Sequence, residues 1–197
     1  MKAPFDFVIE PKGDRYNNIK KVGDKDLIIN TEIFNHQFVN REAIVKSIPT
    51  AFKTDIKTGD TIIVHHNVFR RWHDAKGRER NSRSFFNENT YLVKPDQVFL
   101  YKRKNKWLAP KGYCFVQPIK QLDTINVEKE QPCVGIVKYT DGAYKEKELV
   151  GFTPQSSYEF VIDGNRLYRV MTQFITIKYE YQGNEEKYNP SWAKSCR

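Results

Sequence analysis

Short apolar runs separated by turn-forming residues make up most of this 197-residue chain. The runs are rich in Val, Ile, Phe, Tyr and Thr, and Gly, Pro, Asn and Asp stand between them. This pattern is typical of β-strands, whereas the 3.6-residue apolar spacing of an amphipathic helix is hard to find. The chain is therefore predicted to be all-β, with strands near residues 5–10, 38–48, 60–66, 89–93, 97–102, 113–118, 133–139, 148–153, 158–162, 166–170 and 174–181.

The dipeptide Asp163-Gly164 lies between two of these apolar runs. Asp and Gly tolerate the positive φ angles that a two-residue β-turn requires. A tight hairpin is predicted at this position.

Several of the predicted strands occur twice. Phe7–Pro11 resembles Cys114–Pro118, and Ala43–Lys46 resembles Gly135–Lys138. The matching prolines are 107 residues apart and the matching valines, Val45 and Val137, are 92 apart, so the first copy carries the longer insertions. A repeat of this length indicates two related β modules in tandem, and the insertions are the preferred place for function.

A charged stretch, 102–110, ends in a proline and separates the two copies. We place the module boundary there, which gives a first module over 1–108, a second over 109–181 and a C-terminal tail over 182–197. The tail loses the strand alternation but contains Tyr188 and Trp192. Side chains of this size are expected to pack back on the body or on a neighbouring subunit.

The formal net charge of +9 favours acidic partners, although a solvated basic surface is the simpler interpretation. Three cysteines without paired spacing do not support a disulfide framework and favour a reducing compartment. The first residues lack an apolar signal core, and no apolar stretch approaches membrane-spanning length. These features predict a cytoplasmic protein with no membrane partner.

Taken in order, the repeated segments resemble the GroES-like co-chaperonin family. That family opens with a strand ending in proline, as Phe7–Pro11 and Cys114–Pro118 do, and continues through a long loop. A Gly-Asp turn then leads into an apolar strand, like Gly59–Val64, and a last strand follows an acidic residue, like Pro95–Leu100. The resemblance implies two tandem β-barrels, with a long mobile loop in the first.

The mobile loop implied by the resemblance corresponds to residues 13–36. This segment is polar and much longer than the usual connection of about 4–6 residues. It contains Leu27, Ile28 and Ile29, which look like the aliphatic tripeptide with which such co-chaperonins dock in an apolar groove of a chaperonin. The alternative is an ordinary buried strand, because Ile33 and Phe34 follow closely.

A basic segment, 69–86, combines six cationic side chains with aromatic residues. This composition suits phosphate contact with base stacking and also suits a subunit interface. In a GroES-like barrel the segment would be the roof hairpin, which favours an assembly or lumen-facing role over polyanion contact. The residues concerned are Arg70, Arg71, Trp72, Arg78, Arg80, Arg83, Phe85 and Phe86.

No arrangement of residues predicts catalysis, a cofactor or a metal. His65, His66 and His73 are close in sequence, but adjacent strand residues point to opposite faces. Cys114 and Cys133 lie in apolar strands and are expected to be small core residues. The chain is therefore predicted not to be an enzyme.

Three hypotheses about function follow. The first is a ring-forming, homo-oligomeric co-chaperonin that caps a chaperonin ring and encloses its folding client. The second is a phage virion structural protein built from the same barrels and bound to other virion proteins. The third is a single-stranded nucleic-acid binder that uses Arg70, Arg71, Trp72 and Phe85.

Overall fold

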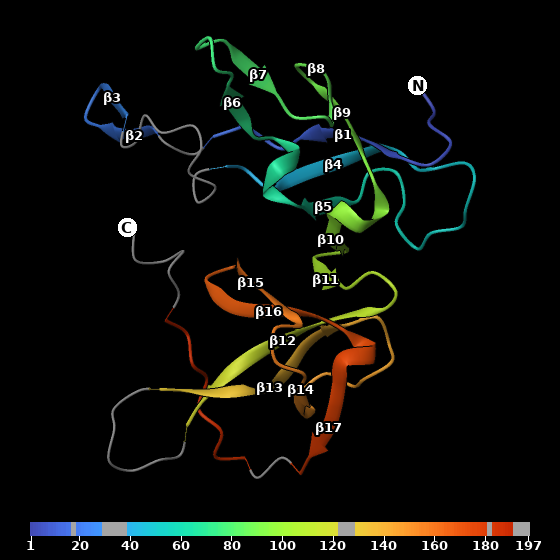
Figure 1. Cartoon of the computed structure of the whole chain (residues 1–197), viewed down its shortest axis with the longest axis vertical. Helices are drawn as coiled ribbons and strands as arrows, with labels where there is room; N and C mark the ends of the chain where they lie inside the picture. Colours follow the sequence, from blue (N-terminus) through green and yellow to red (C-terminus); the bar gives the residue numbers. More distant parts are fainter. Residues whose placement is uncertain (17–18, 29–38, 122–128, 181–182, 191–197) are drawn as a thin grey trace. The chain divides into compact units, whose positions relative to one another are not determined.

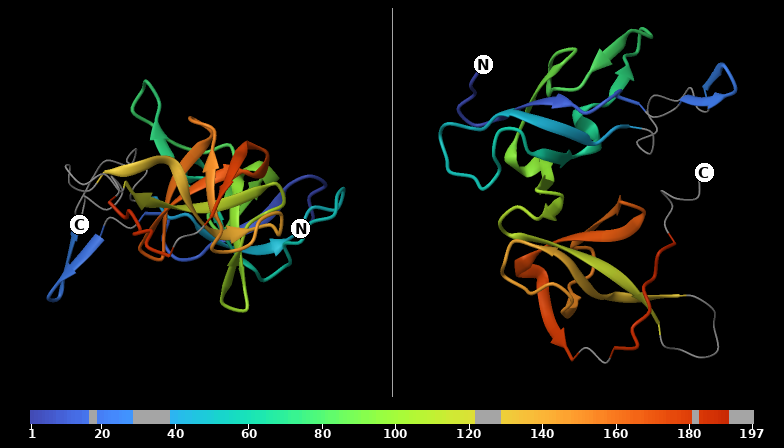
Figure 2. Two further views of the ribbon diagram at one scale, coloured as in Figure 1. Left: turned by 90° about the horizontal axis from the view of Figure 1, so that it is seen from below. Right: turned by 180° about the vertical axis from the view of Figure 1, so that it is seen from behind.

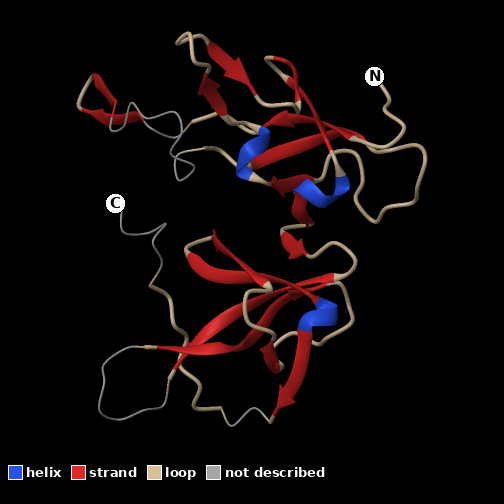
Figure 3. Ribbon diagram, in the orientation of Figure 1, coloured by secondary structure: helices blue, strands red, loops and turns tan. Residues whose placement is uncertain are grey.

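The computed structural model describes residues 1–16, 19–28, 39–121, 129–180 and 183–190. The chain divides into two units, Met1–Lys106 (unit 1) and Trp107–Arg197 (unit 2). Both consist of antiparallel strands, and the helices of the described ranges are three 3₁₀ turns (Figure 3). The prediction of an all-β protein is therefore confirmed. None of the described helices is long and apolar enough to span a membrane.

Unit 1 contains a sheet in the order β11-β10-β5-β4-β1-β9-β8 (Figure 1). Its strands are β1 (Phe7–Pro11), β4 (Glu42–Ser47), β5 (Thr61–Val64), β8 (Phe85–Asn87), β9 (Thr90–Val93), β10 (Val98–Arg103) and β11 (Lys106–Leu108), the last of which crosses the unit boundary. Two hairpins lie outside this sheet, β2 (Ile19–Val22) with β3 (Lys25–Ile28) and β6 (Arg71–His73) with β7 (Glu79–Asn81). The 3₁₀ turns η1 (His66–Val68) and η2 (Pro95–Gln97) connect strands of the unit.

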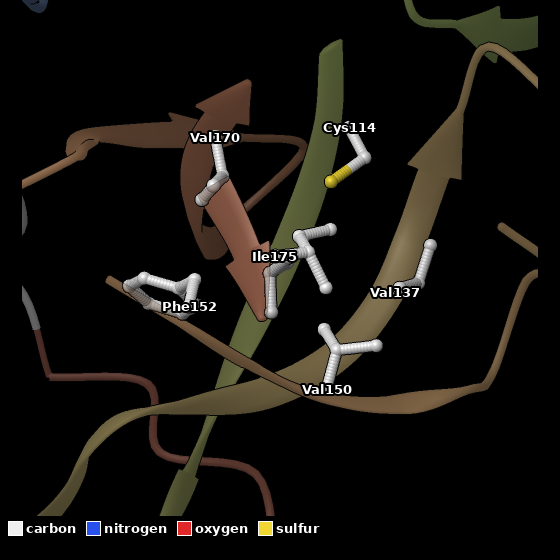
Figure 4. Packing of buried hydrophobic residues seen from close by; sticks show 7 residues of the cluster. Cys114, Val137, Val150, Phe152, Val170 and Ile175 are labelled. Carbon is white, nitrogen blue, oxygen red and sulfur yellow. The ribbon is translucent and has the colours of Figure 1, made fainter. Parts of the chain in front are cut away.

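Unit 2 contains a sheet in the order β15-β16-β12-β13-β14-β17. Its elements are β12 (Tyr113–Lys120), β13 (Glu130–Thr140), β14 (Leu149–Phe152), β15 (Ser157–Ile162), β16 (Asn165–Met171), η3 (Thr172–Phe174) and β17 (Ile175–Tyr179). One buried apolar cluster of this unit is formed by residues from five of these strands (Figure 4). The cluster comprises Cys114, Val116, Val137, Val150, Phe152, Val170 and Ile175.

The two sheets repeat one topology. Read from the opposite edge, the unit 1 order β8-β9-β1-β4-β5-β10 corresponds strand by strand to β15-β16-β12-β13-β14-β17. In each unit a 3₁₀ turn precedes the last of these strands, η2 before β10 and η3 before β17. Figure 2 shows both units from two further sides.

The strand registers repeat as well. Ile9 faces Val45 in unit 1, and the residues matched to them by sequence, Val116 and Val137, face each other in unit 2. One residue earlier on the first strand of each pair, the ladder is interrupted by the same β-bulge. Because a register slip of one residue would turn every side chain to the other face, this agreement ties the sequence repeat to a structural repeat.

The turns that lead into β5 and β14 are also built alike. In unit 1 the Gly59 N–H donates to the Val45 carbonyl (2.8 Å), and the Val45 N–H donates to the Asp60 carbonyl (3.0 Å). In unit 2 the matching bonds run from the Lys147 N–H to the Val137 carbonyl (2.8 Å) and from the Val137 N–H to the Glu148 carbonyl (2.9 Å).

One expectation needs correction. The strand order of each sheet is open, so the described residues do not form the closed barrels that were predicted. The stretch 102–110, in which we placed the module boundary, contains the end of β10, a turn at Lys104–Asn105 and β11. Both turn residues have positive φ, 48° and 61°, which a tight hairpin requires.

Two of the local predictions are confirmed. Asp163 and Gly164 have φ angles of 47° and 74° and join β15 to β16, with Ile162 facing Asn165. Cys114 is fully buried, and burial raises the pKa of its thiol to about 12, so it is an inert core residue. Cys133 is half-buried against the same cluster.

Candidate functional site

The long connection between β1 and β4 leaves the body of unit 1 and returns to it through one narrow base. Tyr16 and Val39, both buried, form an isolated antiparallel bridge. Beside them the Asn40 N–H donates to the Arg15 carbonyl at 2.8 Å. We call Arg15, Tyr16, Val39 and Asn40 the neck. It fixes both ends of the segment 17–38 at adjacent points.

The side chain of Asn40 closes the neck on the sheet. Its Nδ2 donates to the Lys12 carbonyl at 3.0 Å, and its Oδ1 accepts the Glu42 N–H at 2.9 Å. Asn40 is buried, so these bonds are shielded from water. The neck is therefore a rigid base for the segment 17–38, which we call the excursion.

Within the excursion, β2 and β3 form a hairpin around the turn Gly23–Asp24. Lys20 faces Leu27 and Val22 faces Lys25, and Gly23 takes a φ of 62°, which glycine adopts without strain. This hairpin was not predicted, although its Gly-Asp dipeptide is a hairpin signal.

The three tripeptide residues have different positions relative to the hairpin. Leu27 lies on β3 with 55% of its surface exposed. Ile28 ends the strand, and Ile29 is outside the described residues. Leu27 is therefore neither part of a buried strand nor covered by the core of unit 1.

The neck also contacts the base of the β6–β7 hairpin. The Arg71 N–H donates to the Tyr16 hydroxyl at 2.9 Å, and the Arg71 guanidinium lies 5.0 Å from the centre of the Tyr16 ring. Arg15 donates to the Phe69 carbonyl from Nε and from Nη2, at 3.2 and 3.0 Å. The neck therefore contacts both the excursion and the base of the β6–β7 hairpin.

Carboxylates of the basic hairpin neutralise part of its charge. Arg71 pairs with Glu79 at 3.1 Å, and Arg80 pairs with Asp74 at 3.0 Å. Asp74 also accepts the backbone N–H groups of Lys76 and Arg78. The bond from Arg78, followed by those from Lys76 and Arg80, lowers the pKa of Asp74. Arg71 and Arg80 are therefore structural residues of the hairpin.

Three other predicted residues meet at a pocket of about 540 Å³. Arg70, Trp72 and Arg83 line it. The remaining lining residues, which the sequence analysis did not identify, are Asn67, Ser82, Ser84 and Gln97. They come from three separate segments and carry no motif, so only the fold brings them together.

The aromatic residues at the end of the basic segment are not part of this pocket lining. Phe85 packs edge-on against Tyr91 at 5.6 Å, beneath the guanidinium of Arg15. Phe86 and Arg78 are exposed on the surface of unit 1.

The expected orientation of the adjacent histidines is wrong. The rings of His65 and His66 lie 4.2 Å apart and are tilted by 31°. The strand ends at Val64, and His65 caps the 3₁₀ turn η1, so strand alternation does not apply. Across the described ranges, no three His, Cys, Asp or Glu side chains gather where they could hold a metal ion.

Among the residues of unit 2 that the structure describes, Arg166 is a buried charged residue, with a side chain that is 9% exposed. It contacts Glu130 at 2.7 Å and Glu159 at 3.2 Å, and its guanidinium lies 5.4 Å from the centre of the Tyr188 ring. Tyr188 therefore packs on unit 2, whereas Trp192 lies outside the described residues. A comparison with protein-family models and with curated proteins finds no match to this chain.

Proposed function

We propose that this chain is a co-chaperonin-like cap that docks on a chaperonin ring through an apolar contact centred on Leu27. In this proposal the two units are GroES-like modules, and copies of the chain assemble into a ring over a folding client. The repeated strand order and register of the two sheets support a duplicated module.

The single observation that carries the proposal is that Leu27 is exposed on a segment whose two ends are held together at the neck. Leu27 and the nearby Val22 are exposed on the β2–β3 hairpin. The excursion that bears them is closed at its neck by the buried pair Tyr16 and Val39. An exposed apolar side chain presented in this way is suited to burial in a partner's groove.

The energetics favour many simultaneous contacts over one. Each buried aliphatic side chain contributes about 1.5–3 kcal/mol, and ordering the backbone costs about 1–2 kcal/mol per residue. The pairing of β2 with β3 reduces the ordering cost, because part of the segment is already structured. A ring of copies then gains avidity through effective concentration.

In unit 2 the matching connection has a different form. The ladder continues to Lys120 facing Glu130, and the Gln121 N–H donates to the Lys129 carbonyl at 2.8 Å. Only residues 122–128 remain between these paired ends, so docking is assigned to unit 1 alone.

The test replaces Leu27 and Ile28 together by Asp and measures native mass with and without a purified chaperonin ring and ATP. The double variant is expected to lose chaperonin binding while keeping its own assembly state, because a charged side chain in an apolar groove is strongly unfavourable. Phe52→Asp is the matched control, since Phe52 is an exposed apolar residue on another loop of unit 1.

Retained binding by the double variant would refute docking through Leu27. A wild-type protein that ignores the chaperonin but co-purifies with virus particles would instead favour the virion structural hypothesis. Hydrogen exchange over residues 39–47 checks that the substitutions leave the neck and β4 intact.

A further inference from the structure

The two faces of the β2–β3 hairpin carry different side chains. Residues that pair across an antiparallel ladder lie on the same face, and successive residues along a strand alternate between faces. Val22 pairs with Lys25, and Leu27 follows Lys25 by two residues. Val22, Lys25 and Leu27 therefore share one face, which we call the docking face. Lys21 and Asp26, which pair with each other, share the opposite face.

The docking face exposes apolar side chains beside a cation. Val22 is 57% exposed and Leu27 is 55% exposed, and Lys25 is exposed as well. Val22 and Leu27 are diagonal neighbours across the two strands, a separation that one contact can span. A groove that buries both side chains therefore also comes close to the ammonium group of Lys25. Burial of that group without an anion would be strongly unfavourable.

The charges of the two faces are balanced differently. On the opposite face Lys21 has Asp26 directly across the ladder, and opposite charges in such positions attract each other. On the docking face the residue across from Lys25 is the aliphatic Val22. Within the part of the chain that the structure describes, Lys25 forms no ion pair with a carboxylate, Asp24 of the neighbouring turn included. Lys25 is therefore a cation that the docking face offers to a partner.

The charge of unit 1 as a whole has the same sign. Residues 1–106 contain 21 Lys and Arg against 13 Asp and Glu, whereas residues 107–197 contain 12 against 11. Unit 1 therefore carries a formal charge of +8 and unit 2 only +1. A field of this sign speeds the approach of unit 1 to an acidic surface. The unit to which docking is assigned is thus the cationic one.

We propose that the chaperonin groove receiving Leu27 and Val22 has a carboxylate at its rim, which pairs with Lys25. This inference rests on the proposed docking through Leu27 and adds the charge that the partner's groove carries. A charge pair at the rim of an interface acts mainly on the rate of association and on the choice of partner. A groove with a cationic rim would be rejected, because like charges would then face each other.

The experiment measures the rate of association of the full chain with a purified chaperonin ring and ATP, by stopped-flow fluorescence at low and at high salt. Lys25→Gln is expected to slow association about tenfold at low salt, because every copy in the ring loses one attraction. At high salt the difference should largely disappear, since screening weakens the attraction between exposed charges. Lys25→Arg, which keeps the charge, should retain the rate of the unchanged protein.

Lys21→Gln is the matched control. It removes the same charge from the same hairpin, but from the face opposite to Leu27. This variant should change the association rate by less than about threefold at low salt. Hydrogen exchange over residues 19–28 verifies that each variant keeps the β2–β3 hairpin.

The outcomes separate this inference from the docking proposal. If Leu27→Asp abolishes binding while Lys25→Gln associates at the normal rate, docking stands and the acidic rim is refuted. Equal slowing by Lys21→Gln and Lys25→Gln would reduce the effect to general charge attraction and refute the rim pair as well. Retained binding by Leu27→Asp would refute the docking proposal itself, and this inference with it.

Discussion

Some matching positions of the two units carry different residues in the same backbone conformation. Gly59 has a φ of 90° in the turn before β5, and Lys147 has a φ of 73° at the matching position before β14. Both N–H groups make the same 2.8 Å bond to the preceding strand. The left-handed conformation costs a residue with a Cβ about 1–2 kcal/mol, so unit 2 tolerates a strain that unit 1 avoids.

Lys147→Gly is therefore expected to stabilise unit 2 by about 1 kcal/mol. The reciprocal change Gly59→Lys should destabilise unit 1 by a similar amount, since a Cβ added at Gly59 meets no atom within 4 Å and only the backbone conformation matters. Urea unfolding of the two variants measures both effects. A destabilised Lys147→Gly protein would contradict this account.

At the scale of elements, each copy stabilises the turn before its third core strand with a carboxylate. Asp60 accepts the Lys57 N–H at 2.8 Å, and Glu148 accepts the Lys145 N–H at 3.2 Å. A cation from the last core strand pairs with each carboxylate. Arg103 contacts Asp60 and Lys178 contacts Glu148, each at 2.5 Å. The turn and the last core strand are thereby joined in both units.

This arrangement predicts an acid dependence for unit 2. The hydrogen bond from Lys178, followed by that from the Lys145 backbone, lowers the pKa of Glu148 below its usual value of 4.5. A carboxyl with a lowered pKa in the folded state adds stability above the unfolded pKa, and this stability is lost as the pH falls through the folded pKa. The urea concentration at the unfolding midpoint of unit 2 should therefore decrease as the pH is lowered below about 5.

Two variants isolate the contribution of Glu148 to this profile. Glu148→Gln and Lys178→Met should both flatten the acid limb, because each removes the ionised pair. Glu88→Gln, which removes an exposed carboxylate from the turn between β8 and β9, should leave it unchanged. An unaltered profile in the first two variants would show that this pair does not set the acid limb.

At the scale of the whole molecule, the same sheet has acquired different additions. Unit 1 carries the excursion with its neck and the β6–β7 hairpin. In unit 2 a C-terminal segment runs beside β12, with the Lys120 N–H donating to the Glu186 carbonyl (2.7 Å) and the Tyr188 N–H donating to the Pro118 carbonyl (2.8 Å). Asn189 accepts the Arg166 N–H at 2.8 Å and ties this segment to β16.

Arg166→Met is expected to destabilise unit 2 by about 3–5 kcal/mol, because it leaves Glu130 and Glu159 without their buried cation. It should also increase amide exchange over 186–189, since Tyr188 loses its guanidinium contact. Hydrogen exchange monitored by mass spectrometry measures both effects. Lys187→Met, a change of an exposed charge in the same segment, is the control. Unchanged exchange in the Arg166 variant would mean that Arg166 does not hold the segment.

The strands that face a core could be predicted from the sequence, because alternation of apolar residues reports burial directly. The sequence match between Ala43–Lys46 and Gly135–Lys138 is reproduced in the structure, because β4 pairs with β5 in the same register as β13 pairs with β14. One difference between them has a steric cause. A Cβ at Gly135 would lie 2.4 Å from the Gln117 carbonyl oxygen, whereas the matching strands of unit 1 leave room for Ala43. Such a distance depends on three-dimensional packing and leaves no trace in a pattern.

Short exposed strands leave a weak signal in the sequence. The side chains whose burial the structure describes on β2, β3, β6 and β7 are exposed or half-buried, so apolar alternation does not mark these strands. The hairpin of β2 and β3 was not predicted, and a hairpin over 69–86 was expected only from the family resemblance. The pocket could not be predicted either, because Asn67, Ser82 and Gln97 belong to separate connections.

The sequence by itself determined that the chain is all-β, where its core strands run and that they occur twice, since these features follow from local hydrophobic patterning. Only the tertiary structure decided that the sheets are open, that Asn40 and Tyr16 form a neck, and that Arg70, Trp72 and Arg83 share one pocket while Arg71 and Arg80 are paired elsewhere. Contacts of this kind join residues far apart in the chain, and their geometry is set by strand order and register.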